Sequence, residues 1–235
     1  TTPHSMQTHD FYFAGELFDA KHLLGNAWLA SEILKNSDGR FIPVMPQEFE
    51  SQAQHPHEIR DQDILALLEC DLAIFHFDGS DIDSGTLSEF MIAKFADIPS
   101  VILRSDFRAK GDQVDYPWNL MASFYPRTEI VMLDAIRTYK FTGPKKTTTA
   151  PHILTDPALA LDRASKLTSL ISHKVIHAFE RLLKTEPLLS GNDQESVFRW
   201  MENLFAFKRS KSDVRTIMNR IIERKSKLHP GQTNA

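Results

Sequence analysis

Two carboxylates flank a turn of small residues at 83–89, whose sequence is Asp-Ser-Gly-Thr-Leu-Ser-Glu. The run before it, residues 72–77, is apolar and typical of a buried strand. Gly85 lets the backbone approach a ligand closely, and a helix that begins here would direct its free N–H groups at whatever lies above the strand end. Glu89 would then lie about one turn into that helix and face the same crevice as Asp83. Acidic residues near a helix N-terminus are also ordinary capping groups, so the pattern alone leaves a structural interpretation open.

Four further motifs accompany this segment along the chain. They are Tyr-Phe-Ala-Gly-Glu-Leu-Phe at 12–18, Ile-Arg-Asp-Gln-Asp at 59–63, Asp-Gly at 78–79 and Pro-Trp-Asn-Leu-Met at 117–121. Together, in this order, the five motifs resemble the nucleoside 2-deoxyribosyltransferase family over about residues 10–140. Glu16 is a departure, because many relatives carry Pro after the Ala-Gly.

The resemblance implies catalytic roles for four side chains. Glu89 matches the family's nucleophile, and Asp63 matches the acidic residue that faces the base. Asp83 matches a carboxylate that helps to hold the sugar and the nucleophile, and Tyr12 matches a tyrosine whose hydroxyl touches the nucleophile. Attack by Glu89 on the sugar would give a covalent intermediate and retained configuration, as in a retaining glycosidase.

The resemblance also implies substrate contacts from residues around these motifs. They are Gly15, Phe18, Asp78, Gly85, Asn119 and Met121. Asn119 matches an asparagine that the family supplies from a neighbouring subunit, so we expect a homo-oligomer. The expected partners are nucleosides and free nucleobases.

Structural interpretations of the same residues remain open. Asp63 is also suited to the first turn of a helix, beside Asp61. Tyr12 is also suited to core packing with a hydrogen-bonded hydroxyl, and Asn119 to a helix N-cap. Asp71, at the start of an apolar strand, is interpreted as structural.

The fold is expected to be a doubly wound, flavodoxin-like α/β domain with a parallel five-stranded sheet. Short β-type runs at 11–14, 41–44, 72–77, 100–103 and 130–133 alternate with helical patterns at 21–34, 59–68, 86–96 and 120–124. In such sheets, ligands bind at the carboxyl ends of the strands. This domain is expected to cover residues 1–142, and a Gly-, Pro- and Thr-containing linker residues 143–152.

A C-terminal all-helical extension is expected over 153–235, beyond the part that the resemblance covers. Apolar residues recur at threes and fours from Leu159 to Leu183, after a start signal at Pro157 and before a stop at Pro187. Further helices are expected around 197–205 and 214–222. Stripes of this kind need a partner surface, which is either a second subunit or the sheet domain itself. We expect the extension to serve assembly.

Composition and charge favour an ordinary globular protein. The chain is 42% hydrophobic with a mean hydropathy of −0.30, and no run of about 18 apolar residues predicts a membrane span. Residues 1–150 hold 13 basic and 22 acidic residues, a net charge of −9, whereas 151–235 carry a net charge of +5. The basic charges are spread along helical patterns, which favours solvated faces over nucleic-acid binding. Because no signal-peptide pattern is present and Cys70 is the single cysteine, we expect a cytoplasmic protein.

No metal or cofactor is predicted. His55 and His57 flank a proline without a matching Cys/His pair, and His173 and His177 suggest no third ligand. Neither a P-loop nor a Gly-x-Gly-x-x-Gly motif occurs, and the substrate would contribute its own leaving group.

Three functions therefore compete. The leading hypothesis is transfer of 2-deoxyribose between nucleobases. The first alternative is an N-glycosidase acting on nucleosides or their 5′-monophosphates, and Asp83 disfavours the monophosphate because an anion near the sugar's 5′ end would repel it. The second alternative is a catalytically silent nucleoside or nucleotide sensor.

Overall fold

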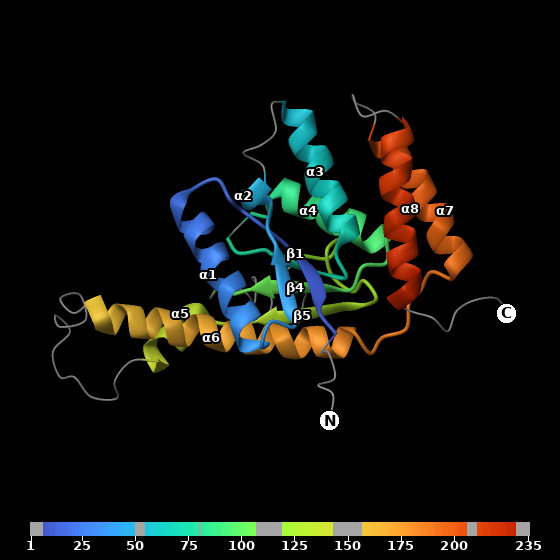
Figure 1. Cartoon of the computed structure of the whole chain (residues 1–235). Helices are drawn as coiled ribbons and strands as arrows, with labels where there is room; N and C mark the ends of the chain where they lie inside the picture. Colours follow the sequence, from blue (N-terminus) through green and yellow to red (C-terminus); the bar gives the residue numbers. More distant parts are fainter. Residues whose placement is uncertain are drawn as a thin grey trace.

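The computed structural model describes residues 7–49, 55–79, 81–106, 119–142, 157–205 and 211–228. Its centre is an all-parallel sheet of five strands in the order β2-β1-β3-β4-β5 (Figure 1). The strands are β1 (His9–Gly15), β2 (Phe41–Val44), β3 (Leu72–His76), β4 (Ser100–Arg104) and β5 (Thr128–Met132). This is the flavodoxin-like strand order, and it confirms the predicted fold class.

The helices lie on both faces of the sheet. In chain order they are α1 (Ala20–Asn36), α2 (Pro46–Phe49), α3 (Pro56–Glu69), α4 (Ser84–Phe95), α5 (Ala135–Phe141), α6 (Pro157–Leu182), α7 (Gly191–Met201) and α8 (Lys211–Leu228). A short 3₁₀ helix, Glu202–Leu204, follows α7. Among the helices described, none is both long and apolar enough to cross a membrane.

Alternate residues of the strands enter two separate cores, because successive side chains point to opposite faces. On one face, Phe11 and Phe13 of β1 pack with α1 and α6. On the other face, Tyr12 and Ala14 of the same strand pack with α3, α4, α7 and α8. Both faces of a parallel sheet are normally covered in this way, and the continuous apolar strands of this chain reflect it.

The apolar stripe of α6 covers the sheet within the same chain. Phe179 is fully buried, with its ring 5.3 Å from that of Phe11 and 5.0 Å from that of Phe41. Figure 1 shows α6 running beside α1 beneath the sheet. The sequence left two partner surfaces open for this stripe, a second subunit or the sheet domain. In the structure the stripe packs on the sheet domain. The expected linker at 143–152 lies outside the described residues.

The two helices after α6 pack on the opposite face, beside α3. Phe198 of α7 and Met218 of α8 are fully buried in the core that also contains Tyr12. Arg224 of α8 pairs with Asp10 at 2.8 Å and with Asp71 at 3.2 Å, which fixes α8 to the amino ends of β1 and β3. The structural interpretation of Asp71 is therefore supported, and Cys70 beside it is buried as a small apolar residue.

One expected helix is wrong, and two short helices were missed. Residues 120–124 form turns, because Phe124 and Arg127 adopt positive φ angles of 68° and 50° that end any helix started by Asn119. The missed α5 is capped by Asp134, whose carboxylate accepts a hydrogen bond from the Arg137 amide at 2.8 Å. The missed α2 is a single turn at Pro46–Phe49.

We expect Phe179→Ala to destabilise the protein by about 3–5 kcal/mol, because it leaves a cavity between α6 and two strands. Leu161→Ala is the matched control, since Leu161 lies on the same helix and is 60% exposed, and it should change the free energy of unfolding by less than about 0.5 kcal/mol. Urea unfolding of both variants measures the difference. Equal effects of the two substitutions would show that α6 does not contribute to the core.

Candidate active site

The candidate site lies where β1 and β3 neighbour each other and the strand order reverses. Ligands of open α/β sheets bind at this switch point, outside the carboxyl ends of the strands. Tyr12 pairs with Ala73 and Gly15 pairs with His76 in the β1–β3 register, so the two strands end together. Helix α4 begins shortly after β3, and α3 packs on the same face of the sheet.

The central contact joins Tyr12 to Glu89. The Tyr12 hydroxyl, on a fully buried side chain, donates to Glu89 Oε1 at 2.6 Å across 77 positions of sequence. Glu89 lies in the second turn of α4 and is half-buried. Burial raises the pKa of Tyr12 well above its usual value, and the negative charges of Glu89 and Asp63 raise it further. The phenol therefore stays protonated and remains a donor to the carboxylate.

Asp63 lies in the middle of α3, half-buried, and not in its first turn. Its charge acts on the same phenol as that of Glu89. The neighbouring Asp61 is buried and pairs with Arg60, which contacts the carbonyl of Leu204. Asp61 therefore has a structural environment, and Asp63 is the one of the two whose charge acts on Tyr12.

Asp83 is the N-cap of α4. Its Oδ2 accepts hydrogen bonds from the Thr86 amide at 2.7 Å and from the Thr86 hydroxyl at 2.8 Å. Gly85 lies in this first turn, and a Cβ there would come within 3.2 Å of the same oxygen. The small residue thus leaves room for the cap, and the cap in turn fixes where α4 begins and where Glu89 lies.

The loop after β1 is held by two contacts that the sequence did not reveal. Asn26 of α1, which is buried, donates to the Glu16 carbonyl at 2.9 Å. His22 Nε2 lies 3.4 Å from the Glu16 carboxylate, so the departure at this position makes an exposed polar contact with α1. Gly15 closes β1 against His76, whose Cβ a side chain there would approach to 3.2 Å. Phe18, further along the loop, is 78% exposed.

Asp78 joins the two loops that follow β3 and β4. Its carboxylate accepts hydrogen bonds from the Ser105 amide at 2.6 Å, from the Ser105 hydroxyl and from the Asp106 amide at 3.1 Å. His76 Nε2 lies 2.9 Å from it as well. Although burial alone would raise the pKa of Asp78, the hydrogen bonds from His76 and Ser105 hold it below its usual value.

These contacts use most of the acceptor capacity of the Asp78 carboxylate. Asp78 therefore holds the loops after β3 and β4 together. Polar residues directly after parallel strands were the sequence signal for Ser105 and Asp106.

Asn119 organises the turn that follows the undescribed residues 107–118. Its Oδ1 accepts from the amides of Met121 at 2.9 Å and Ala122 at 3.0 Å. Leu120 is 65% exposed and Met121 is 73% exposed on this turn. The structure therefore shows Asn119 as a local cap that presents two apolar side chains to the outside.

Metal-binding groups do not gather in the described part of the chain. Within those residues, no set of three His, Cys, Asp or Glu side chains is arranged to hold an ion. His55 and His57 stack on each other, with ring centroids 5.4 Å apart, and His173 and His177 are exposed on α6.

Comparison with known proteins gives one family match. A family model described as nucleoside 2-deoxyribosyltransferase matches residues 11–121. No curated protein matches the chain.

Two solved structures are similar to part of the chain. A conserved protein from Enterococcus faecalis V583 is 26% identical with a TM-score of 0.46, over 53% of this chain and 91% of that one. A 2-desoxiribosyltransferase from Leishmania mexicana is 18% identical with a TM-score of 0.43, over 55% of this chain and 92% of that one.

The matched segment runs from β1 to the turn that Asn119 begins, and so contains Tyr12, Asp63, Asp83 and Glu89. The resemblance found in the sequence is thereby confirmed over residues 11–121, which match the model of the nucleoside 2-deoxyribosyltransferase family.

Proposed function

We propose that the protein transfers 2-deoxyribose from one nucleobase to another, with Glu89 as the nucleophile. The observation that supports this most is the 2.6 Å hydrogen bond from the buried Tyr12 hydroxyl to Glu89 Oε1, within the segment that matches the family model. A protonated phenol that donates to a carboxylate favours its ionised form and holds it in one rotamer. An ionised, oriented carboxylate beside the strand ends is what attack on an anomeric carbon requires.

The reaction has two halves. In the first, a carboxylate oxygen of Glu89 bonds to C1′ while the C1′–N bond breaks, and the bonding electrons leave with the base. Asp63, whose charge acts on Tyr12, in its protonated form gives the departing base a proton or a hydrogen bond. In the second half, a ring nitrogen of an incoming base attacks C1′, the bond from C1′ to the Glu89 oxygen breaks, and the proton of that nitrogen passes to Asp63. Two displacements retain the configuration of the sugar.

In this proposal, Asp83 binds the sugar of the substrate. Its Oδ2 is engaged by Thr86, and its Oδ1 remains to accept from a sugar hydroxyl. An anionic oxygen there repels a 5′-phosphate, so a free nucleoside is the preferred substrate. Gly15 and Phe18 of the first loop, and Asp78 through the loops it joins, complete the walls.

We further propose that the turn at Asn119 meets a second copy of the chain. Exposed apolar side chains that adjoin one another are typical of interaction sites, and Leu120, Met121 and Phe124 are 65%, 73% and 77% exposed. Contact through this turn would bring Asn119 and Met121 to a neighbour's sugar site. The active form in this account is a homo-oligomer.

Base exchange tests the proposal directly. Incubation with deoxyinosine and adenine should yield deoxyadenosine and hypoxanthine, separable by chromatography. Hypoxanthine without deoxyadenosine would show an N-glycosidase, and no product would show a sensor. Faster release of base from deoxyinosine 5′-monophosphate than from deoxyinosine would contradict the role given to Asp83.

We expect Glu89→Ala to lower the rate of exchange by several powers of ten, on the order of 4–8 kcal/mol in the barrier, because the covalent route is lost. Glu186→Ala is the matched control, since Glu186 is exposed and lies after α6. The control should keep the wild-type rate, and both variants should give the wild-type circular dichroism spectrum. Appreciable exchange by folded Glu89→Ala would exclude Glu89 as the nucleophile.

We expect Tyr12→Phe to lower kcat about tenfold or more while the protein stays folded, because only the hydroxyl is removed from a fully buried ring. Loss of a donor to the ionised Glu89 favours its protonated form, so the acidic limb of the pH–rate profile should move to higher pH. A pH series of initial rates measures both effects. A lower kcat with an unmoved acidic limb would limit Tyr12 to a packing role.

A further inference from the structure

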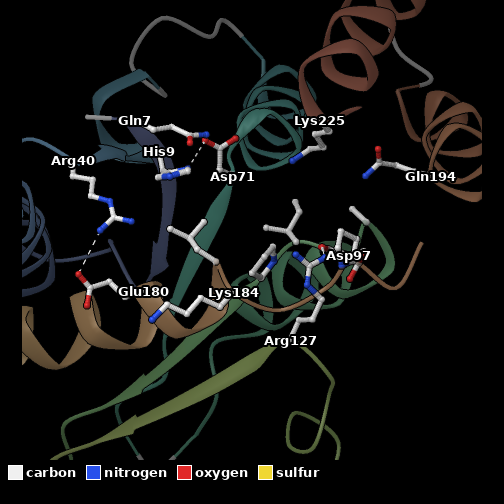
Figure 2. A pocket seen from close by; sticks show the side chains of 15 residues that line it. Gln7, His9, Arg40, Asp71, Asp97, Arg127, Glu180, Lys184, Gln194 and Lys225 are labelled. Atoms are coloured by element: carbon white, nitrogen blue, oxygen red, sulfur yellow. Dashed lines mark hydrogen bonds and ion pairs between the residues drawn. The ribbon is translucent and has the colours of Figure 1, made fainter. Parts of the chain in front are cut away.

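A cavity of about 340 Å³ opens at the amino-terminal edge of the sheet (Figure 2). Its walls include residues at the starts of strands, such as His9, the first residue of β1, Asp71 before β3 and Pro99 before β4. The segment after α6 and Lys225 of α8 close it. It therefore lies at the edge opposite to the one where Gly15 ends β1 and Asp83 begins α4.

The cavity holds cationic groups that its carboxylates do not all neutralise. Arg127 pairs with Asp97 at 2.7 Å in a buried ion pair, and Arg40 pairs with Glu180 at 3.4 Å. Lys184 and Lys225 also line the cavity, and neither forms an ion pair with a carboxylate of the described residues. Two lysines are thus available to an anion.

Lys225 carries the stronger argument because it is only 6% exposed. Its Nζ donates to the Cys70 carbonyl at 2.7 Å, and the described residues offer no acceptor for the other two N–H donors. Burial lowers the pKa of Lys225 to about 8, the expected response of a poorly solvated ammonium. Oxygen atoms of a bound anion would satisfy both donors.

Asp71, on the same wall of the cavity, has a carboxylate oxygen that needs a hydrogen-bond donor. It is 7% exposed, and its Oδ2 lies 3.2 Å from Arg224 and 3.5 Å from His9. Its other oxygen, Oδ1, is buried and has no hydrogen-bond partner among the residues described. A buried carboxylate oxygen without a donor is costly, so a ligand that carries a hydroxyl is favoured here.

The positions of these groups fit one molecule with two kinds of polar group. Figure 2 shows Asp71 and Lys225 on one side of the cavity, and Lys184 and Arg127 across from them. The volume of about 340 Å³ is in the usual range for a small-molecule pocket and is much larger than a single phosphate ion needs.

We propose that this cavity binds a small hydroxylated phosphate monoester, of the size of a pentose phosphate. Its phosphate oxygens accept hydrogen bonds from Lys225, a hydroxyl group donates to Asp71 Oδ1, and Lys184 across the cavity adds a positive charge. Inorganic phosphate is the other source of the same oxyanion chemistry. The site is separate from that of Glu89.

Isothermal titration calorimetry of the full chain with ribose 5-phosphate, inorganic phosphate and ribose tests the proposal. Ribose 5-phosphate should bind at least ten times more tightly than inorganic phosphate, and ribose should give no detectable heat. Lys225→Met should weaken the binding of ribose 5-phosphate at least tenfold. Lys174→Met is the matched control, since Lys174 is exposed on α6 and does not line the cavity, and its affinity should equal that of wild type.

Two further variants keep the test decisive if Lys225→Met fails to fold. Lys184→Ala changes an exposed side chain, so it should keep the thermal stability of wild type and bind ribose 5-phosphate about threefold or more weakly. Glu89→Ala, at the opposite edge, should bind it with unchanged affinity. Equal affinity for inorganic phosphate, full affinity in Lys184→Ala, or loss of binding in Glu89→Ala would overturn the proposal.

Discussion

The structure depends on one constraint, which is that an all-parallel sheet must be covered on both of its faces. The strands here are buried on both sides, with Phe11 and Phe13 facing one core and Tyr12 and Ala14 facing the other. The segment at 11–121 that matches the family model supplies α1 on one face and α3 and α4 on the other. Helix α6, which lies beyond that segment, fills the remaining space beside α1 with Phe179 and its apolar neighbours. The chain after residue 121 is therefore needed for the core of the sheet, whatever else it does in an assembly.

The same constraint brings the candidate catalytic groups together. Tyr12 points to the face that α3 and α4 cover, because strand side chains alternate between faces. Asp63 on α3 and Glu89 on α4 therefore approach the Tyr12 hydroxyl from the helices of that face. The cap formed by Asp83 fixes the start of α4, and so fixes the height of Glu89 above the sheet. A shift of β1 by a single residue would turn the phenol to the other face and separate it from both carboxylates.

The sequence predicted those parts of the structure that depend on local patterns. Apolar runs located all five strands, and the cap at Asp83 and the periodicity around Phe179 located α4 and α6. Local patterns do not reveal contacts between distant segments. The pairing of Tyr12 with Glu89 was implied by the family resemblance and could not be derived from spacing.

Two tertiary groupings were not predicted for this reason. Asp71 and Lys225 lie far apart in the chain and share a cavity only because α8 docks at the strand starts. The anchoring of Asp78 by Ser105 likewise depends on β4 lying beside β3. The expected helix at 120–124 failed because positive φ angles at Phe124 and Arg127 are set by the surrounding fold.

The central claim is that Glu89 forms a covalent bond to the sugar, and mass spectrometry of trapped protein tests it most directly. Wild-type protein mixed with a deoxynucleoside, without an acceptor base, and then quenched in acid should gain the mass of one deoxyribosyl group. Proteolysis should place that mass on the peptide that contains Glu89. An adduct on another peptide, or catalytic turnover with no adduct at any quench time, would contradict the account.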